Sequence, residues 1–458
     1  MNSAGIHVNR RDFLVRTGLL LGGALLAGGV ARPRADAELT DSLKVESWES
    51  VREQFALSRE LIHMAGFFLA SHPAAVRQAI ERHRRELDQN PIGYWIDQSE
   101  RLEGAVLRAA AEYLGGHPAD IALTDSTTMG LGLLYGGLTL RDGQEILTTT
   151  HDHYSTAMSL RLRAARTGTS IHQISLYRRP SAASRDETID SLVRAIRPQT
   201  RIVAVTWVHS STGVKLPIRD MADALAKINA ARAESDRVLL CVDGVHGLGV
   251  EDVRMEDLGC DFFVAGTHKW MFGPRGTGLV WGHPRAWPAV NAIIPTFNHE
   301  AYGVWLKDIP PFSPTHPSRA ETRLLPVDIP YGAIMTPGGF HSFEHRWALN
   351  EAFRFHQAIG KARVADRIHA LNDQCKEGLA KMRHVTLHTP RSRSLSAGII
   401  CFEITGWTPE KVVERLRTRG IMASVTPYAT QYVRLAPSLL TSPEEVETTL
   451  EEIRNLNG

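Results

Sequence analysis

Cysteine is scarce in this chain. Four cysteines stand among 458 residues, and no two of them form a Cys-x-x-Cys pair. The spacing therefore predicts neither a zinc site nor a disulfide framework. Cys241 and Cys401 lie in apolar, strand-like runs, Cys375 lies in a helical run, and Cys260 precedes another apolar run. We expect all four to be buried free thiols.

A large excess of charge of one sign is also absent. The 52 basic residues nearly balance the 50 acidic residues, which leaves a formal net charge of +2. Such a balance argues against a nucleic-acid partner. Because 43% of the residues are hydrophobic and 22% are charged, the composition is that of a folded protein with a sizeable core. The length is enough for two or three domains.

An apolar run long enough to cross a membrane is missing near the N-terminus. The mild apolar run over residues 17–30 is too short for that purpose. It follows the adjacent Arg10 and Arg11, and Ala35-Asp-Ala37 offers small residues where a signal peptidase cuts. This order is typical of a twin-arginine export signal cleaved after Ala37. We therefore expect the twin-arginine export machinery as a partner and a periplasmic location, with a retained N-terminal anchor as the alternative.

Lysine is much rarer than arginine, which makes Lys269 conspicuous. It ends the run Asp261-Phe-Phe-Val-Ala-Gly-Thr-His-Lys269, and Asp243 ends the apolar run Val238-Leu-Leu-Cys-Val-Asp243. A lysine in apolar surroundings can form an imine with an aldehyde, and an aspartate at a strand end can hold a proton on a pyridine nitrogen. Pyridoxal 5'-phosphate (PLP) needs both groups. We predict PLP as the cofactor, with Lys269 as tether and proton carrier and Asp243 as partner of the ring nitrogen. A solvated lysine and a strand-capping aspartate are the alternatives.

Short apolar runs alternate with helical runs from residue 121 onward, which predicts a mostly parallel sheet covered on both faces. Strands are expected at 121–124, 145–149, 170–176, 201–207, 238–243, 262–265 and 278–281, with helices at 128–139, 155–167, 188–196 and 218–233 between them.

The flanking regions have a different pattern. Before the alternation we expect a helix over 38–60, a strand over 61–66, a helix over 73–87, a loop over 90–95 and a helix over 99–114. After it we expect an irregular stretch over 291–337, a helix over 339–359 and an α+β tail with elements at 384–388, 399–404, 410–419, 421–425, 432–436 and 443–456. The tail therefore predicts a smaller C-terminal domain.

The turn Thr124-Asp-Ser-Thr-Thr-Met-Gly130 lies between a predicted strand and a predicted helix. Hydroxyls and free backbone N–H groups at a helix N-terminus bind anions. We expect the cofactor phosphate there, with Thr127 and Thr128 as donors. The alternative is an ordinary helix cap.

The turn Thr150-His-Asp-His-Tyr154 offers a flat imidazole beside the same sheet edge. We expect the ring of His153 to stack on the pyridine ring. A metal site made by His151 and His153 is an alternative, but no third ligand is evident. A purely structural histidine is another.

Polar groups in two further loops complete the predicted site. Ser210 is expected to bond the phenolic oxygen of the cofactor, with His209 in reserve. His246 is expected to contact the same ring oxygen. Thr267 and His268 are expected to add phosphate contacts.

These motifs resemble those of the class V aminotransferase family of fold-type I PLP enzymes. The most specific are Val242-Asp-Gly-Val-His246 and Gly266-Thr-His-Lys269, then Ser126-Thr-Thr128 and Asp152-His153. The runs 90–95 and 336–347 resemble the isopenicillin-N-epimerase-like branch, and a twin-arginine-exported protein of this general type acts in periplasmic siderophore tailoring.

The resemblance carries several implications for this chain. It implies an α/β fold with a large PLP-binding domain and a homodimer whose sites lie at the subunit interface. It implies that Thr336 of one subunit lies near the phosphate bound by the other. It also implies Arg434 as the clamp for a substrate carboxylate, because guanidinium binds carboxylate with two bonds. Asn90 and Tyr94 are the further substrate-binding candidates.

One stretch departs from the family's cysteine desulfurases. Those enzymes carry a catalytic cysteine shortly before the arginine, whereas Val425 to Tyr432 contains no cysteine. Persulfide chemistry is therefore not expected.

The sequence predicts a PLP enzyme that transforms the amino group of an amino acid or an amino-acid moiety, with transamination as the first choice. Epimerisation or β-elimination by a lyase needs the same early steps and stays open. An exported binding protein that keeps the fold without turnover is the alternative of another class. The predicted domains are the signal (1–37), an N-terminal segment bordering the active site (38–98), the large domain (99–335), and an interdomain helix with the small domain (336–458).

Overall fold

The computed structural model describes residues 44–299, 301 and 329–456. The predicted signal over residues 1–37 lies outside these residues, and so do residues 302–328 of the predicted irregular stretch. No helix in the described ranges is long and apolar enough to cross a membrane.

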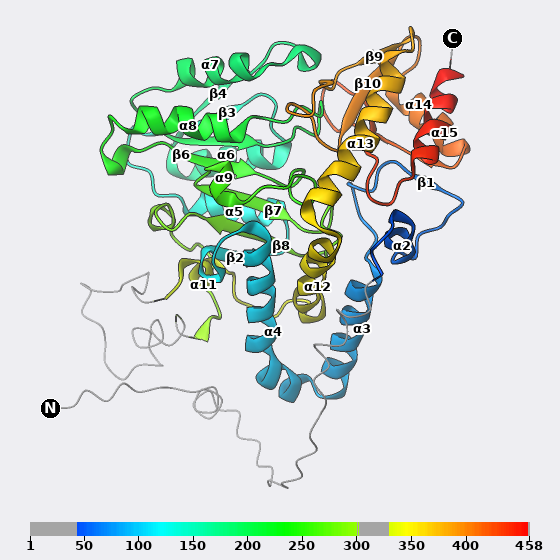
Figure 1. Cartoon of the computed structure of the whole chain (residues 1–458). Coiled ribbons are helices and arrows are strands. Elements are labelled where there is room, and N and C mark those ends of the chain that lie inside the picture. The colour runs from blue at the N-terminus through cyan, green and yellow to red at the C-terminus, as the bar shows by residue number, and fades with distance from the viewer. Residues whose placement is uncertain (1–43, 300, 302–328, 457–458) are drawn as a thin grey trace, which may run out of the picture.

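A seven-stranded sheet forms the centre of the large domain (Figure 1). Neighbouring strands are parallel except around β8, which is antiparallel to both β2 and β7. This arrangement confirms the predicted mostly parallel sheet. In sheet order the strands are Ile121–Thr124 (β2), Gly278–Gly282 (β8), Phe262–Gly266 (β7), Leu239–Asp243 (β6), Thr200–Thr206 (β5), Glu145–Thr149 (β3) and Ser170–Ile174 (β4).

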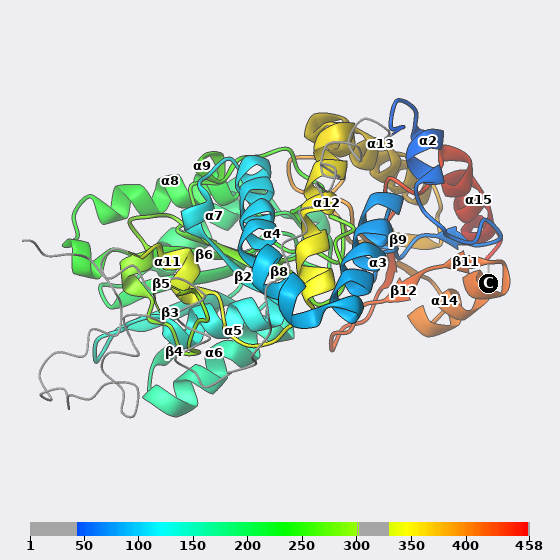
Figure 2. The same cartoon turned by 90° about the horizontal axis from the view of Figure 1, so that it is seen from below.

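Helices cover both faces of this sheet. Figure 2 shows the strands between one group formed by α5 and α6 and another that contains α7, α8 and α9. Within β5, Ile202 and Ala204 join the hydrophobic cluster that includes α5 and α6, whereas Val203 and Val205 join the cluster on the other face. The central strands β5, β6 and β7 are fully buried and largely apolar because both of their faces are covered, whereas the edge strand β4 is polar and only partly buried. The helices are Thr127–Gly137 (α5), Tyr154–Thr167 (α6), Arg185–Ala195 (α7), Ile218–Asn229 (α8) and Met255–Leu258 (α9).

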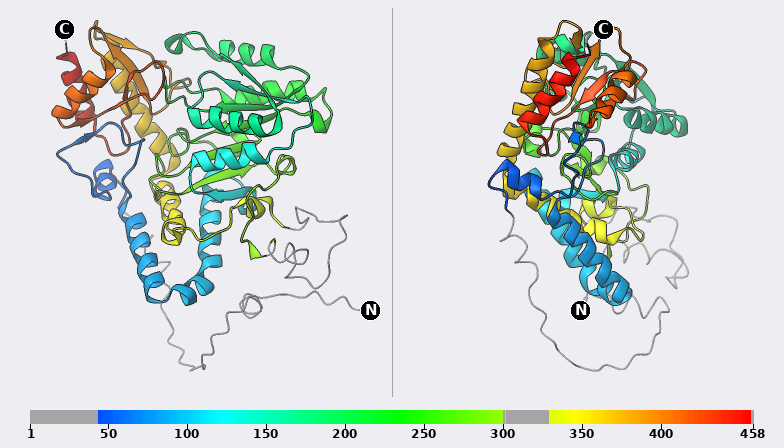
Figure 3. Two further views of the ribbon diagram at one scale, coloured as in Figure 1. Left: turned by 180° about the vertical axis from the view of Figure 1, so that it is seen from behind. Right: turned by 90° about the vertical axis from the view of Figure 1, so that its right-hand side faces the viewer.

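A four-stranded antiparallel sheet forms the small domain (Figure 3). Its strand order is β12-β13-β10-β9, and three helices pack beside it around a separate hydrophobic cluster. The strands are Val385–Leu387 (β9), Ile400–Ile404 (β10), Ser424–Val425 (β12) and Val433–Leu435 (β13), and the helices are Lys361–Ala380 (α13), Pro409–Thr418 (α14) and Pro443–Arg454 (α15).

Three helices lie between the two sheets and extend beyond them (Figures 1 and 2). They are Ala74–Gln89 (α3), Pro91–Leu114 (α4) and Phe343–Ile359 (α12). The prediction of a loop over residues 90–95 is wrong. Asn90 caps α4 by accepting a hydrogen bond from the N–H of Gly93, and Pro91 occupies the first turn. The residues that resemble a loop are therefore a helix start.

Other predicted bounds also need correction. The described part of the predicted helix 38–60 forms only Trp48–Glu53 (α2), because Phe55 turns inward to pack on Phe272 and Phe355. The predicted strand 421–425 is two strands in different sheets. Ile421–Met422 (β11) pairs with Ile62–His63 (β1), while β12 pairs with β13. The irregular stretch contains the short helix Tyr331–Met335 (α11). The predicted domain boundaries stay predictions.

Candidate active site

Four loops follow neighbouring strands at the carboxyl edge of the large sheet. The order β7-β6-β5-β3 places these loops side by side, and all four strands are parallel. Lys269 follows β7, Asp243 ends β6, Ser210 follows β5 and His153 follows β3. Ligands of open α/β sheets bind at this edge. Four sequence-predicted residues therefore belong to one sheet edge.

Asp243 and Lys269 perturb each other's protonation. The Asp243 side chain is 2% exposed, and its Oδ1 accepts a hydrogen bond from the N–H of Val245 at 3.2 Å. Burial raises the pKa of Asp243 to about 6, although Val245 and the charge of Lys269 oppose the rise. Burial lowers the pKa of Lys269 to about 8; Asp243 opposes this fall and Arg434 adds to it. A carboxyl and an amine with displaced pKa values in one cleft are typical of a catalytic site.

His246 holds the amine of Lys269. Its Nε2 lies 3.2 Å from the Lys269 Nζ, and its Nδ1 accepts a hydrogen bond from the indole N–H of Trp270 at 3.3 Å. Burial lowers the pKa of His246 far below its ordinary value, so the ring is neutral. Since Nδ1 is an acceptor, the proton sits on Nε2 and points at the nitrogen of Lys269. This contact favours the uncharged amine. The predicted contact of His246 with a ring oxygen stays a prediction.

The N-terminus of α5 forms an anion cradle. Ser126 caps α5 by accepting a hydrogen bond from the N–H of Met129. Among the described residues, the N–H groups of Thr127 and Thr128 in the first turn of α5 therefore remain free to bind an anion. The Thr127 hydroxyl accepts from the N–H of Gly266 at 2.7 Å, so its own proton points elsewhere. The Thr128 hydroxyl lies 3.2 Å from that of Ser155.

Two observations show that a phosphate fits this cradle. A Cβ on Gly266 would lie 3.0 Å from the Thr127 hydroxyl and 3.1 Å from the His268 ring, so only glycine leaves this space open. The buried Nδ1 of His268 has no hydrogen-bond partner among the described residues. Unbonded N–H groups, hydroxyls and an orphaned imidazole nitrogen form a donor set suited to a phosphate.

Thr267 does not belong to this donor set. Its hydroxyl is fully buried and bonds the hydroxyl of Thr277 at 2.5 Å. The prediction of a phosphate contact by this side chain is therefore not supported by its position. The ring of its neighbour His268 lies beside Gly266 at the cradle, and its phosphate contact stays a prediction.

His153 is positioned by Asp152. The Asp152 carboxylate accepts hydrogen bonds from the hydroxyls of Thr148 and Thr149 and from the N–H of Thr149. It also accepts a hydrogen bond from the N–H of Thr206, which ties the turn after β3 to β5. His153 caps α6, with its Nδ1 3.1 Å from the Ser155 hydroxyl. Burial, together with the charges of Lys269 and Arg434, lowers the pKa of His153 to about 4. A neutral ring therefore faces the two cations, and its stacking role stays a prediction.

His151 lies beside the site rather than in it. Its ring stacks on Tyr177 at 3.9 Å, and its Nε2 accepts from the N–H of Leu176 at 3.2 Å. Across the described ranges, no group of three histidine, cysteine, aspartate or glutamate side chains is arranged to hold a metal ion.

Ser210 has a partner that the sequence did not suggest. Its hydroxyl lies 2.7 Å from the phenol of Tyr428, which comes from the small domain. His209, the alternative candidate for the same contact, is fully buried, and its Nδ1 lies 2.8 Å from the Tyr177 phenol. Ser210 therefore faces the cleft, whereas His209 does not. A contact of Ser210 with the phenolic oxygen of PLP stays a prediction.

Arg434 brings an unpaired cation to the cleft. It is 3% exposed, donates to the Ser424 hydroxyl and to the Ser210 carbonyl at 3.1 Å each, and lies 4.6 Å over the ring of Phe67. None of its partners in the described part of the chain is a carboxylate, and burial lowers its pKa. A buried guanidinium that lacks an anion is a natural receptor for a carboxylate ligand.

Three predicted residues lie elsewhere within this chain. The Thr336 hydroxyl donates to the Gly332 carbonyl at 2.8 Å and accepts from the N–H of Leu123 at 3.0 Å, so it is engaged in its own subunit. Asn90 caps α4, and the Tyr94 phenol bonds the His83 ring at 2.9 Å.

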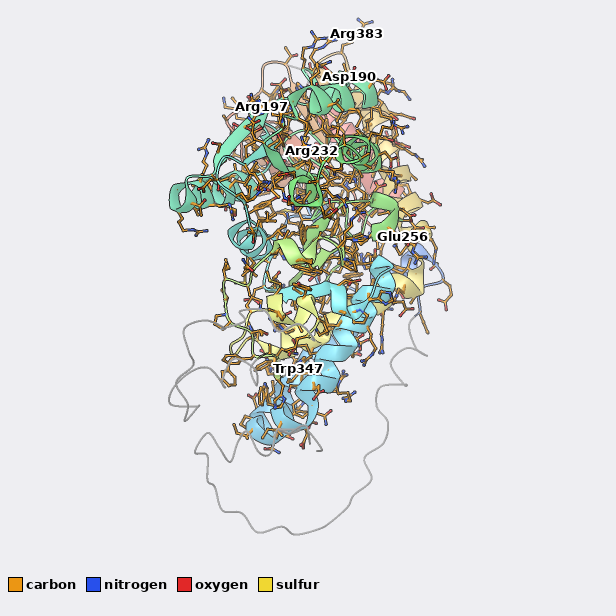
Figure 4. The ribbon with its side chains drawn as sticks, turned by 90° about the vertical axis from the view of Figure 1, so that its left-hand side faces the viewer. Asp190, Arg197, Arg232, Glu256, Trp347 and Arg383 are labelled. Atoms are coloured by element: carbon orange, nitrogen blue, oxygen red, sulfur yellow. The ribbon has the colours of Figure 1, made fainter. Side chains whose placement is uncertain are left out.

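The position of Tyr94 separates it from the small domain. Its ring also packs 5.9 Å from that of Trp347. Figure 4 shows Trp347 at the end of the molecule opposite Arg383, which precedes β9. A substrate role for Asn90 and Tyr94 has no support from their place in the single chain.

Sequence reasoning missed Tyr428 and Phe67. Tyr428 stands in the very stretch that was inspected for a cysteine, three residues after Val425. Phe67 follows the predicted strand over 61–66 and contacts His246 and Arg434. Neither has a local motif, since both reach the site through contacts between distant segments.

A family model described as Aminotransferase class-V matches residues 99–293 and 341–432, which is more than half of the chain. The chain belongs to the class-V aminotransferase family. The match includes Lys269, Asp243, His153, Ser210 and the α5 cradle. PLP, the cofactor of this family, is confirmed as the cofactor of this protein.

Two named relatives show how broad the family is. Isopenicillin N epimerase of Streptomyces clavuligerus is 24% identical over 428 residues, which cover 91% of this chain and 100% of the epimerase. A probable cysteine desulfurase of Halalkalibacterium halodurans is 23% identical over 382 residues, which cover 81% of this chain and 84% of that protein.

Solved structures share the fold. A variant of C-DES with glycine covalently linked to its PLP cofactor has a TM-score of 0.76 and 20% identity, and the match covers 89% of this chain and 99% of that chain. The cysteine desulfurase of Thermococcus onnurineus has a TM-score of 0.72 and 20% identity, over 91% and 98% of the two chains. These matches confirm the fold-type I architecture.

We predict that the cofactor-free protein recombines with PLP faster as the pH rises toward 8. The amine of Lys269 attacks only when uncharged, and its pKa is lowered to about 8 from an ordinary 10.5. The rate constant should therefore rise about tenfold per pH unit below that pKa and level off above it. Asp243→Asn removes an attraction that raises this pKa, so the profile should shift to lower pH. Stopped-flow absorbance measures both profiles. A wild-type rate that climbs up to the ordinary lysine pKa would contradict the geometry.

Proposed function

We propose that this protein is a PLP-dependent epimerase that inverts the α-carbon of an amino acid or of an amino-acid moiety in a larger molecule. One observation carries the proposal. The amine of Lys269 lies close enough to feel the charges of both Asp243 and the buried guanidinium of Arg434, and Arg434 has no carboxylate partner in the described ranges. An α-amino acid brings a carboxylate for the guanidinium and places its α-hydrogen near the amine.

The residues divide the work between them. PLP, when bound, supplies an electron sink for the pair left at the α-carbon. Asp243 keeps the ring nitrogen protonated, because a buried carboxylate gains most from a cationic partner. Lys269 removes the α-proton as a general base, helped by its lowered pKa. Arg434 orients the substrate through its carboxylate.

Persulfide chemistry has no support in this cleft. All four cysteines are buried free thiols, as predicted. Cys401 is opposite Arg434 in the β10–β13 ladder, but it is fully buried, and burial raises its pKa to about 12. A thiol of this kind is not a nucleophile.

Elimination is the second candidate. The structure of the cystine C–S lyase C-DES in complex with cysteine persulfide matches this fold with a TM-score of 0.74. Elimination and inversion share the removal of the α-proton by Lys269. Transamination, the first choice from the sequence, stays a prediction, since the named relatives are an epimerase and desulfurases.

Chiral chromatography separates these reactions. The holoenzyme is incubated with single enantiomers of alanine, methionine and glutamate, and the products are resolved. We expect each enantiomer to yield its mirror image. Cystine is added as a probe because alanine, methionine and glutamate carry no β-leaving group. Pyruvate and ammonia from cystine without inversion would favour elimination, and a keto acid from alanine with stoichiometric loss of the aldehyde form would favour transamination.

We predict that Arg434→Lys raises the KM for amino-acid substrates about tenfold to a hundredfold, because loss of a bidentate charge-assisted contact costs about 1.5–3 kcal/mol. Lysine keeps the charge and loses the fork of two parallel donors. The exposed Arg417 on α14 provides the matched control, and Arg417→Lys should leave KM unchanged. Steady-state kinetics on both variants is the measurement. An unchanged KM in Arg434→Lys would contradict the role of Arg434 in binding the substrate carboxylate.

We also propose that the protein is exported by the twin-arginine route and acts in the periplasm on a secreted metabolite or siderophore side chain. The support is the arginine pair at residues 10 and 11 and the small residues before the predicted cleavage after Ala37. Cell fractionation tests this. We expect the shortened protein in the periplasm and a precursor in the cytoplasm when Arg10 and Arg11 are both replaced by lysine. A full-length, membrane-bound form would favour the retained anchor.

A homodimer is the remaining proposal. Its support is a group of exposed apolar side chains, which includes Phe340 at 81% and Phe297 at 57% exposure. These rings pack on each other at 6.4 Å and are costly to leave in water. Sedimentation should give twice the chain mass, and a monomer at micromolar concentration would contradict it.

A further inference from the structure

Tyr428 brings a second proton-bearing group into the cleft. Its phenol lies 2.7 Å from the Ser210 hydroxyl, and its ring meets that of His153 edge to face at 6.2 Å. The residue comes from the loop between β12 and β13 of the small domain. It therefore reaches the site from a different part of the chain than the strand-end residues do.

Tyr428 and Lys269 contact loops on opposite sides of β6, the strand that ends at Asp243. Lys269 follows β7, and its amine contacts His246, which follows β6. Tyr428 instead contacts the loops after β5 and β3, and these strands lie on the other side of β6 in the sheet. A group seated on Asp243 is thus flanked by an amine on one side and a phenol on the other.

Burial keeps the proton on Tyr428. Burial raises the pKa of Tyr428 to about 12; the Ser210 bond and Arg434 oppose the rise, and Asp243 and Asp152 add to it. The His153 ring beside it is neutral. A neutral phenol at ordinary pH is a proton donor, and the nearby guanidinium of Arg434 favours the phenolate that forms once the proton has left.

We propose that Tyr428 is the second catalytic proton carrier and donates a proton to the α-carbon on the side opposite Lys269. The assignment rests on the proposed epimerase function. In one direction the α C–H bond breaks and its proton moves to the Lys269 amine, while the electron pair stays with the substrate–cofactor system. The Tyr428 O–H bond then breaks, and a new C–H bond forms on the other side. The reverse direction exchanges the two roles, and no oxidant or reductant is needed.

Ser210 completes the proton path. Its hydroxyl is the hydrogen-bond partner of the phenol in the described structure and donates to the phenolate once that forms. The proton held by Lys269 returns to the phenolate through solvent, so both groups recover their starting states. The bond between Ser210 and Tyr428 therefore stabilises the phenolate until its proton returns, beside its effect on the phenol's position.

The test is hydrogen exchange at the α-carbon, followed by proton NMR in D₂O. The probes are the separate enantiomers of alanine, methionine and glutamate, and the variant is Tyr428→Phe, which keeps the ring contact with His153 and removes the hydroxyl. The wild type should exchange both enantiomers. The variant should exchange the enantiomer whose hydrogen faces Lys269 at the wild-type rate. It should exchange the other enantiomer about 100-fold or more slowly. Its visible cofactor absorbance reports that the fold and the tether are intact.

Tyr154→Phe is the matched control. Its ring also contacts His153, at 4.6 Å, and its side chain is exposed. This variant should exchange both enantiomers as the wild type does. If Tyr428→Phe slows both enantiomers equally, or slows neither, the assignment of Tyr428 is wrong while the proposed function stands. If the wild type exchanges no probe, the epimerase proposal fails and this assignment fails with it.

Discussion

Lys269→Ala is expected to lower turnover by on the order of 10⁴-fold, since one side chain is both the covalent tether and the general base. The variant should also lose the visible absorbance band of the lysine-bound aldehyde. The two other described lysines whose pKa is lowered by burial are engaged elsewhere. Lys376 is buried but bonds the Ser396 hydroxyl and the Arg391 carbonyl, and Lys361 bonds two backbone carbonyls. Steady-state kinetics and an absorbance spectrum measure both effects.

Two controls sharpen this prediction. Lys227→Ala removes an exposed lysine on α8 and should change neither turnover nor absorbance. Added methylamine should restore part of the turnover of Lys269→Ala, because a free amine can replace the missing base. A Lys269→Ala protein that still forms a covalent adduct with PLP after borohydride reduction would refute the assignment.

Asp243→Asn is expected to lower turnover roughly 10²–10³-fold, the range found when one preorganised electrostatic partner is removed. The amide keeps the acceptor for the Val245 N–H, so the strand end should stay folded. It cannot carry the negative charge that holds a proton on the ring nitrogen. The cofactor should remain bound through Lys269, which separates this variant from Lys269→Ala.

Asp142→Asn is the control for this second prediction. Asp142 is exposed in the loop before β3, and its amide variant should match the wild type in turnover. Circular dichroism should show that both variants keep the fold. Unchanged turnover in Asp243→Asn, with PLP bound, would mean that another group protonates the ring nitrogen.

The part of the site that lies on strand ends could be predicted from the sequence. An apolar run ending in Asp243 and another leading to Lys269 are local patterns, and the parallel sheet brings such ends together. The α5 cradle follows the same logic, because Ser126, Thr127 and Thr128 stand directly between a strand and a helix. These predictions needed only neighbouring residues and the topology.

Other residues depend on contacts that no local pattern encodes. Tyr428 reaches Ser210 across 218 positions of sequence, and only the packing of the small domain decides that its phenol points at this loop. Thr267 and His268 are adjacent, but one hydroxyl turns to Thr277 and the other side chain faces the cradle. A motif names both residues without deciding which one contacts a ligand.

The α3–α4 hairpin shows a third kind of difference. Asn90 and Pro91 favour a turn in isolation, yet they also form the usual start of a helix. Packing of Tyr94 on Trp347 decides for the helix. The predicted substrate role of Asn90 and Tyr94 rested on a family resemblance of this segment and stays a prediction.

The central claim is that PLP is held by Lys269 beside the Asp243 carboxylate. Borohydride reduction of the purified holoprotein, followed by peptide mass spectrometry, tests it most directly. We predict one pyridoxyl adduct per chain, on the peptide that contains Lys269. An adduct on Lys361, Lys376 or another lysine, or no adduct in protein saturated with PLP, would contradict the account.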